Sequence, residues 1–186
     1  QSLGLTTSAT NVIGFGESSE HRIKHMDRVR TLQDQSHENG WSGFTSFISW
    51  PVQLENNTFG KRNRGKNRFD LGVGPTEYLR HVAISRLFFD NIKHIQASWP
   101  TMGLDIAQMA ILGGADDIGS TMMEENVVSA SGTTKTCALE VELQETVRRA
   151  GFEPCRRDSD YVLLDTPHVG VDVQGFPSPP PLQPSK

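Results

Sequence analysis

The sequence predicts an α/β protein that is the C-terminal half of a (β/α)8 barrel, made of four strand–helix units and a C-terminal tail. Short runs of apolar and β-branched residues alternate with amphipathic helical patterns, which is typical of parallel βαβ units. The tail, residues 165–186, is rich in Pro and Ser, so residues 1–164 remain as one domain. A closed barrel of eight units takes about 250 residues, so this domain corresponds to about half of one.

The first unit is predicted from Thr6 to Gly40. Thr6–Ile13 is rich in β-branched residues and is followed by Gly14, which indicates a strand. Ser18 or Ser19 can cap the helix that follows, and Asn39-Gly40 ends it. Its apolar residues share one side of that helix: Ile23, Met26, Val29 and Leu32.

The second unit starts with a strand over Phe44–Trp50, which Pro51 ends. A long polar and basic stretch, Gln53–Val73, follows as a loop, and loops of this length are usually functional or disordered. The helix after Gly74 continues to Asn91 and has apolar residues at helical spacing: Leu79, Val82, Ala83 and Leu87.

The last two units are shorter. The third has a strand at His94–Trp99 and a helix at Asp105–Leu112, which Gly113-Gly114 ends. The fourth has a very short strand at Asp117–Gly119 and, after a loop that reaches about Thr136, a helix whose apolar face contains Leu139, Leu143 and Val147. For residues 165–186 the composition predicts disorder or an extended polyproline conformation.

Composition narrows the class of protein. The net charge is −4, so no basic surface indicates nucleic-acid binding, and no apolar run reaches the roughly 20 residues of a membrane span. The start has no signal-peptide pattern, so we expect a cytoplasmic protein. Cys137 and Cys155 are widely spaced, which favours two free thiols over a zinc site, an iron–sulfur site or a disulfide framework.

A half barrel would leave parallel strands unpaired at both edges, which proteins avoid. Either the chain pairs with another copy or it is a fragment of a longer enzyme. We expect the fragment, and the first residue, Gln1, is consistent with a truncated or processed start.

In barrels of this kind the active site lies on the loops that follow the strands. These loops are predicted at residues 14–18, 50–58, 96–103 and 119–132. They contain small residues, Trp, amides and carboxylates but little Lys or Arg. That composition favours a polar ligand rich in hydroxyl and ring-nitrogen groups over a multiply charged phosphate, which usually draws Arg, Lys or a glycine-rich helix start.

The fourth loop also resembles a known family. Residues 114–134, GADDIGSTMMEENVVSASGTT, are similar to the signature of the dehypoxanthine futalosine cyclases, which are radical S-adenosylmethionine enzymes of menaquinone biosynthesis. The resemblance extends over nearly all of Leu3–Leu164. FTSFISWPVQLENNT resembles the family's second motif, and Gly14 and Glu17 match its G-H-x-E, with Phe15 at the place of the His.

The resemblance implies a radical S-adenosylmethionine barrel whose N-terminal half is missing here. That half would carry a CxxxCxxC motif for a [4Fe–4S] cluster, for which neither Cys137 nor Cys155 can substitute. The implied reaction cyclises dehypoxanthine futalosine to its cyclic, spirocyclic product, starting from a 5′-deoxyadenosyl radical. The alternatives are an aminofutalosine synthase, a relative of the deazaflavin-cofactor synthases, or a non-catalytic remnant that binds a nucleoside-like ligand or a partner.

The strand-end loops supply the candidate site residues. Glu124 and Glu125 are the predicted catalytic pair, since carboxylates can bind a ribose diol and one can act as a base. Glu17, with Gly14, is predicted to contact the cofactor or to cap the following helix. The predicted substrate contacts are amides and hydroxyls of the other loops: Gln53, Gln96, Ser98, Ser120, Thr121 and Asn126.

Two further patterns are interpreted as structural. His21 and His25 stand four residues apart on the first predicted helix, but among charged neighbours and with no third ligand, so no metal site is expected. The basic run Lys61–Arg68 is isolated in an acidic chain, which favours a solvated loop over a nucleic-acid site.

Overall fold

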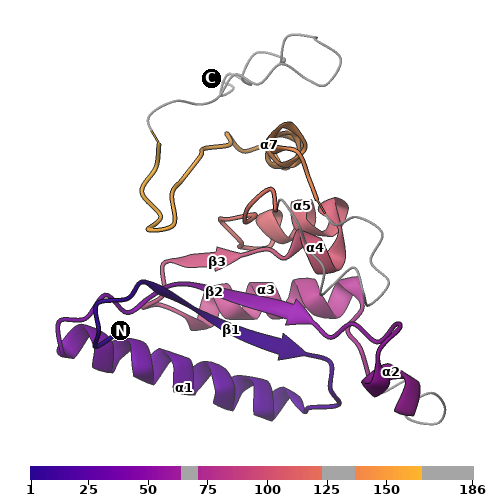
Figure 1. Cartoon of the computed structure of the whole chain (residues 1–186), viewed down its shortest axis with the longest axis horizontal. Helices are drawn as coiled ribbons and strands as arrows, with labels where there is room; N and C mark the ends of the chain where they lie inside the picture. The colour runs from indigo at the N-terminus through magenta and orange to yellow at the C-terminus, as the bar shows by residue number, and fades with distance from the viewer. Residues whose placement is uncertain (64–70, 123–136, 165–186) are drawn as a thin grey trace.

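The computed structural model describes residues 1–63, 71–122 and 137–164 (Figure 1). The predicted tail, residues 165–186, lies outside these ranges, as do most of the basic run and the central part of the fourth loop. The described chain is a mixed α/β structure. None of its helices is both long enough and apolar enough to cross a membrane.

A parallel sheet of three strands forms the centre of the fold, in the order β1-β2-β3. The strands are β1 (Thr7–Ile13), β2 (Phe44–Pro51) and β3 (His94–Gln96). They confirm the first three predicted strands, although β3 is three residues long and therefore shorter than predicted. It ends early because the next turn is already committed to a helix that starts at Trp99 with Pro100 in its first turn.

Four helices match the predicted ones to within a few residues. Ser18 is the N-cap of the first, as one of the two predicted alternatives had it, with its side chain accepting from the His21 N–H. Two short helices, α2 and α4, were not predicted, and α2 lies inside the long stretch that was predicted as a loop. The helices are α1 (Ser19–Glu38), α2 (Thr58–Arg62), α3 (Pro75–Phe88), α4 (Trp99–Met102), α5 (Leu104–Leu112) and α7 (Glu140–Arg149).

The predicted fourth strand is reduced to one bridge, in which Asp117 pairs with Gln96 in parallel. A ladder begins there, since Asp116 N–H donates to the Ile95 carbonyl at 3.0 Å and Ala97 N–H to the Asp117 carbonyl at 2.8 Å. It stops because Gly119, at φ 83°, turns the chain away. The structure thus has three strand–helix units and a rudimentary fourth, so the count of four full units is not confirmed.

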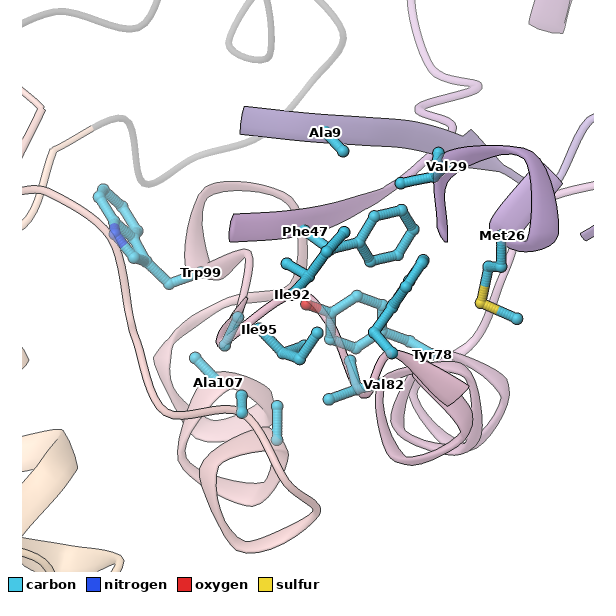
Figure 2. Packing of buried hydrophobic residues seen from close by; sticks show 14 of the residues in the cluster. Ala9, Met26, Val29, Phe47, Tyr78, Val82, Ile92, Ile95, Trp99 and Ala107 are labelled. Carbon is cyan, nitrogen blue, oxygen red and sulfur yellow. The ribbon is translucent and has the colours of Figure 1, made fainter. Parts of the chain in front are cut away.

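The hydrophobic core lies between the sheet and the helices that cover one of its faces (Figure 2). Phe47 of β2 and Tyr78 of α3 are fully buried at its centre, and Met26 and Val29 of α1 pack against it. The predicted stripe on α1 is only partly correct, because Ile23 is 41% exposed. Polar residues continue the buried face instead: Gln33, whose amide donates to the carbonyls of Phe44 and Asn91, and Ser36.

After α7 the chain returns to the sheet as a hairpin, which the sequence did not predict (Figure 1). Arg157 and Leu163 form an antiparallel bridge within this C-terminal hairpin, which spans residues 156–164. The ring of Tyr161 at its tip stacks on His94 of β3, with the ring centroids 4.2 Å apart. The hairpin thereby fixes the end of the described chain beside β3.

Candidate functional site

The candidate site is the edge of the sheet where β1, β2 and β3 end. Parallel strands end on the same side of a sheet, so the loops that follow them lie together. The first loop contacts helix α2, which follows the second loop, through Phe15 and Phe59, whose rings meet edge to face at 5.2 Å. The third and fourth loops meet where the Trp99 indole bonds to the Ser120 carbonyl.

In the first loop, Glu17 binds the backbone of its own turn. Its carboxylate accepts hydrogen bonds from the N–H groups of Gly14 (2.8 and 3.1 Å) and Phe15 (2.7 Å). Arg22 adds a third donor, its Nε, at 2.7 Å. Partial burial by itself would raise the pKa of Glu17, but these donors outweigh it and hold the pKa below its ordinary value. Glu17 is therefore an ionised carboxylate that folds the loop around itself.

Gly14 makes this turn possible. Its φ is 103°, a region that side chains rarely adopt, and a Cβ placed there would lie 2.9 Å from the carbonyl carbon of Gly72. Gly14 also accepts a hydrogen bond from the Gly72 N–H at 2.8 Å. The glycine is thus needed for the close approach of two loops.

Arg22 extends the first loop to α3. Its guanidinium bridges Glu17 and Glu77, with Nη1 2.6 Å from Glu77 Oε1. His81, one turn further along α3, is buried and lies 3.4 Å from the amide of Asn11 on β1. Burial, together with the positive charge of Arg22, lowers the pKa of His81 to about 4, so its imidazole is neutral at pH 7.

In the second loop, Gln53 turns back onto the backbone. Its side-chain amide donates to the Pro51 backbone carbonyl at 3.1 Å, and the backbone carbonyl of Gln53 accepts from the Asn57 side chain at 2.6 Å. Asn57 in turn caps α2 by accepting from Gly60 N–H. Trp50, at the end of β2, is 40% exposed.

The third loop is fixed from below by Tyr78. The buried Tyr78 hydroxyl accepts a 2.7 Å hydrogen bond from Ser98 N–H, and burial raises the pKa of Tyr78 to about 12. The Ser98 hydroxyl bonds to Thr101 at 2.8 Å. Trp99 is buried, and its indole N–H donates to the Ser120 carbonyl at 3.1 Å, which joins the third loop to the fourth.

The fourth loop starts with a turn built on Asp117. The Asp117 carboxylate accepts from Gly119 N–H at 2.7 Å, and Arg157 of the C-terminal hairpin binds the same carboxylate. Gly119 packs directly on Gln96, since a Cβ at that position would lie 2.7 Å from the Gln96 amide nitrogen. The Thr121 carbonyl accepts from Ala138 N–H.

The predicted site residues therefore fall into two groups. The third and fourth loops bring together Gln96, Ser98, Ser120 and Thr121, and the first and second loops hold Gly14, Glu17 and Gln53. The predicted catalytic pair, Glu124 and Glu125, lies outside the described residues, as does Asn126.

Sequence reasoning missed the charged residues that fix these loops: Arg22, Glu77, Asp117 and Arg157. All four pair with residues 40 or more positions away, so no local pattern could indicate the partners. Asp117 alone had a signal, because Asp two positions before Gly is typical of a turn that the Asp side chain closes.

A cavity of about 710 Å³ adjoins the fourth loop. It lies between residues 116–121, helix α7 and the C-terminal hairpin, and both polar and apolar side chains line it, among them Asp117, Leu143 and Tyr161. Within residues 1–63, 71–122 and 137–164, no group of three His, Cys, Asp or Glu residues could hold a metal ion. Cys137 and Cys155 are exposed, free thiols.

Comparison with known proteins identifies the family. Residues 41–170 match the model of the family described as the CofH/MqnC C-terminal region. The chain belongs to this family. The matched residues include β2, β3 and the second, third and fourth strand-end loops, so most of the candidate site lies in the region that matches the family.

Relatives in this family carry several names. The chain is 44% identical to a cyclic dehypoxanthine futalosine synthase of Halalkalibacterium halodurans, over 88% of this chain and 40% of that protein. It is 36% identical to an aminodeoxyfutalosine synthase of Thermus thermophilus, over 86% of this chain and 41% of the relative. It is also 36% identical to a 5-amino-6-(D-ribitylamino)uracil–L-tyrosine 4-hydroxyphenyl transferase of Archaeoglobus fulgidus, over 88% and 45%.

The chain spans less than half the length of each of these CofH/MqnC relatives. The family region that the chain matches is described as C-terminal.

Proposed function

We propose that this chain is the substrate-binding, C-terminal half-barrel of a radical S-adenosylmethionine enzyme that cyclises dehypoxanthine futalosine in menaquinone biosynthesis. The observation that carries the proposal is the 44% identity to a cyclic dehypoxanthine futalosine synthase over 88% of the chain. The relatives with the two other names are 36% identical over similar lengths. The composition of the strand-end loops, with few Lys or Arg residues, suits a nucleoside-derived substrate.

Within this proposal, the third and fourth loops bind the substrate. Gln96, Ser120 and Thr121 present amide and hydroxyl groups at one sheet edge, and such groups pair with sugar hydroxyls and ring nitrogens. Ser98, also predicted as a substrate contact, is buried with its hydroxyl bonded to Thr101, so it supports the third loop instead. Glu124 and Glu125 follow Thr121 in the sequence and supply the carboxylates that bind a ribose diol and remove a proton.

The first loop is assigned to the cofactor. Because both oxygens of Glu17 already accept donors from Gly14, Phe15 and Arg22, Glu17 acts by shaping the loop that would hold S-adenosylmethionine. When bound, that cofactor supplies the radical that starts the reaction. The described residues do not fit a [4Fe–4S] cluster, since their two cysteines are single exposed thiols, so no ligand to it is assigned here.

The N-terminal part of the enzyme completes the barrel in this proposal. Asp117 pairs with β3 on one side, and the 710 Å³ cavity borders the same segment. A strand of the N-terminal part that lies along Asp116 and Asp117 would continue the parallel sheet there.

A chimeric enzyme tests the proposal. Residues 1–164 replace the matching segment of the Halalkalibacterium halodurans synthase, and the product is analysed by mass spectrometry after anaerobic reconstitution. Cyclic dehypoxanthine futalosine is the expected product. Glu124→Gln and Glu125→Gln in the chimera are each expected to abolish it, with Glu38→Gln, at an exposed position of α1, as the matched control.

The alternatives give different results. Conversion only of the aminodeoxyfutalosine synthase's substrate would replace the proposed reaction with that enzyme's. A folded chimera that converts neither substrate but binds the nucleoside would identify the chain as a non-catalytic remnant. Product formation at the wild-type rate by both Gln variants would remove the carboxylates from the mechanism.

A further inference from the structure

The C-terminal hairpin reaches the base of the fourth loop through one ion pair. Arg157 binds both carboxylate oxygens of Asp117, with Nη2 3.0 Å from Oδ1 and Nε beside Oδ2. Such two-point pairing fixes direction as well as distance. The Asp117 side chain is only 9% exposed, so the pair is shielded from water on the acid side.

Asp117 passes this constraint to the turn. The carboxylate that Arg157 binds also accepts from Gly119 N–H at 2.7 Å, and the Asp117 backbone carbonyl accepts from Ala97 N–H at 2.8 Å. Asp117 therefore contacts Arg157, the chain that follows β3 and the turn at Gly119. Any movement of the Asp117 carboxylate must displace Gly119.

The turn lies against the candidate substrate contacts. Gly119 packs on the Gln96 amide, and the following carbonyls, of Ser120 and Thr121, accept from Trp99 and Ala138. A shift of Gly119 would thus change the place of Gln96, Ser120 and Thr121 together.

Arg157 is itself held rigidly. Its guanidinium lies over the Tyr161 ring, 3.9 Å from the ring centroid, and the same ring stacks on His94. Its Nη1 donates to the Asp158 carbonyl at 2.9 Å. The hydrogen bond to Asp117 is the main cause that raises the pKa of Arg157 further, so the guanidinium stays charged.

We propose that Arg157 is a positioning residue, which acts through Asp117 to fix the Gly119–Thr121 turn against Gln96 in the substrate site. For its effect on catalysis this inference rests on the proposed function. Its effect on the turn does not, and the two are measured separately.

Hydrogen exchange in the 186-residue chain measures the turn. In Arg157→Met, the amides of Gly119 and Ala138 are expected to exchange about tenfold faster, as the loss of a charge-assisted hydrogen bond implies, while amides of β1 and β2 keep their rates. Arg157→Lys is expected to restore part of the protection. The neighbouring Arg156→Met is the matched control. Arg156 is exposed, and its ion pair with Glu140 is long at 3.6 Å, so its loss should leave the turn unchanged. Unchanged Gly119 exchange in Arg157→Met, or an equal increase in β1 and β2, would overturn the inference.

Kinetics of the chimeric enzyme measure the site. Arg157→Met is expected to raise the KM for the nucleoside substrate about tenfold, with a smaller change in kcat. Arg157→Lys is expected to reverse part of this increase in KM. Arg156→Met is expected to keep the wild-type KM. Wild-type KM in Arg157→Met overturns the inference. If the unsubstituted chimera forms no product, the proposed function fails, and the exchange experiment still decides whether Arg157 positions the turn. If Arg157→Met does not fold, Arg157→Lys and Asp117→Asn are compared in both measurements.

Discussion

The Nε of Arg22 lies 2.7 Å from Oε1 of Glu17, and this contact joins the first strand-end loop to the helix layer. The same guanidinium binds Glu77 on α3, so this one arginine on α1 connects the first loop to α3. The Arg22 and Glu17 side chains are 14% and 19% exposed, well below the exposure of ordinary surface pairs, whose contribution to stability is small. The loop is therefore fixed before any ligand binds.

Acid should loosen this loop through Glu17. Because the pKa of Glu17 is lower in the folded chain than its ordinary 4.5, its ionised form stabilises the fold above that pH, and this contribution is lost as the pH falls through the folded pKa. Glu17→Gln is expected to lower the melting temperature at pH 7, with a difference from wild type that shrinks below about pH 4. Melting curves between pH 7 and pH 3 measure this. Glu20→Gln, which breaks an exposed pair with Lys24, is the control and should change little. A constant difference at all pH values would contradict the prediction.

His81 gives a second pH dependence, in a different range. Its pKa falls from 6.5 to about 4 on folding, so between these values the unfolded chain binds more protons and stability rises with pH. A shift of this size corresponds to a loss of roughly 2–3 kcal/mol in the free energy of unfolding on acidification from pH 7 to pH 4. Urea unfolding at pH 7, 6, 5 and 4 tests it. His81→Gln should flatten the dependence in this range. An unaltered slope in His81→Gln would rule out His81 as its source.

Gly14 is predicted to tolerate no side chain. Gly14→Ala places a Cβ 2.9 Å from Gly72 and Val52 at φ 103°, which combines backbone strain with a clash. The expected cost is about 1–3 kcal/mol in the free energy of unfolding. Gly74→Ala is the matched control, because Gly74 has φ −77° and no atom would lie within 4 Å of the new Cβ. Urea titrations of both variants compare them, and equal stabilities would show that the two loops can separate at no cost.

Local pattern was sufficient for the elements that carry their own signals. β1, β2 and the four longer helices could be predicted, because strand propensity, Ser18 as a cap and the Gly stops act within a few residues. The exposure of Ile23 and Leu87 could not, since it depends on what lies beside the helices: each is apolar at helical spacing, yet they are 41% and 86% exposed in this chain.

The place of the candidate residues in the fold could be predicted, but not the contacts that fix them. The structure has Gly14, Glu17 and Ser120 on loops that follow strands and Gln96 at the end of β3, as the strand-end rule predicts, and their roles stay predictions. The partners that fix those loops come from distant segments, such as Arg157 for Asp117, 40 positions apart. Helix α4 was missed for the same reason, since Tyr78 and Trp99 fix the chain there through contacts with α3 and the fourth loop.

The hydroxyl of Tyr78 should matter more than its small size suggests. Tyr78→Phe keeps the buried ring but removes the acceptor for Ser98 N–H, which is itself buried at 1% exposure. A buried donor without a partner costs about 1–3 kcal/mol, so the free energy of unfolding should fall by that amount. The loss should be constant between pH 5 and pH 9, because burial raises the pKa of Tyr78 to about 12 and the hydroxyl stays protonated throughout. Urea unfolding at both pH values measures it, and hydrogen exchange at Ser98 locates it. Wild-type stability together with a protected Ser98 amide would mean that another acceptor replaces the hydroxyl, and that Tyr78 supports the third loop by packing alone.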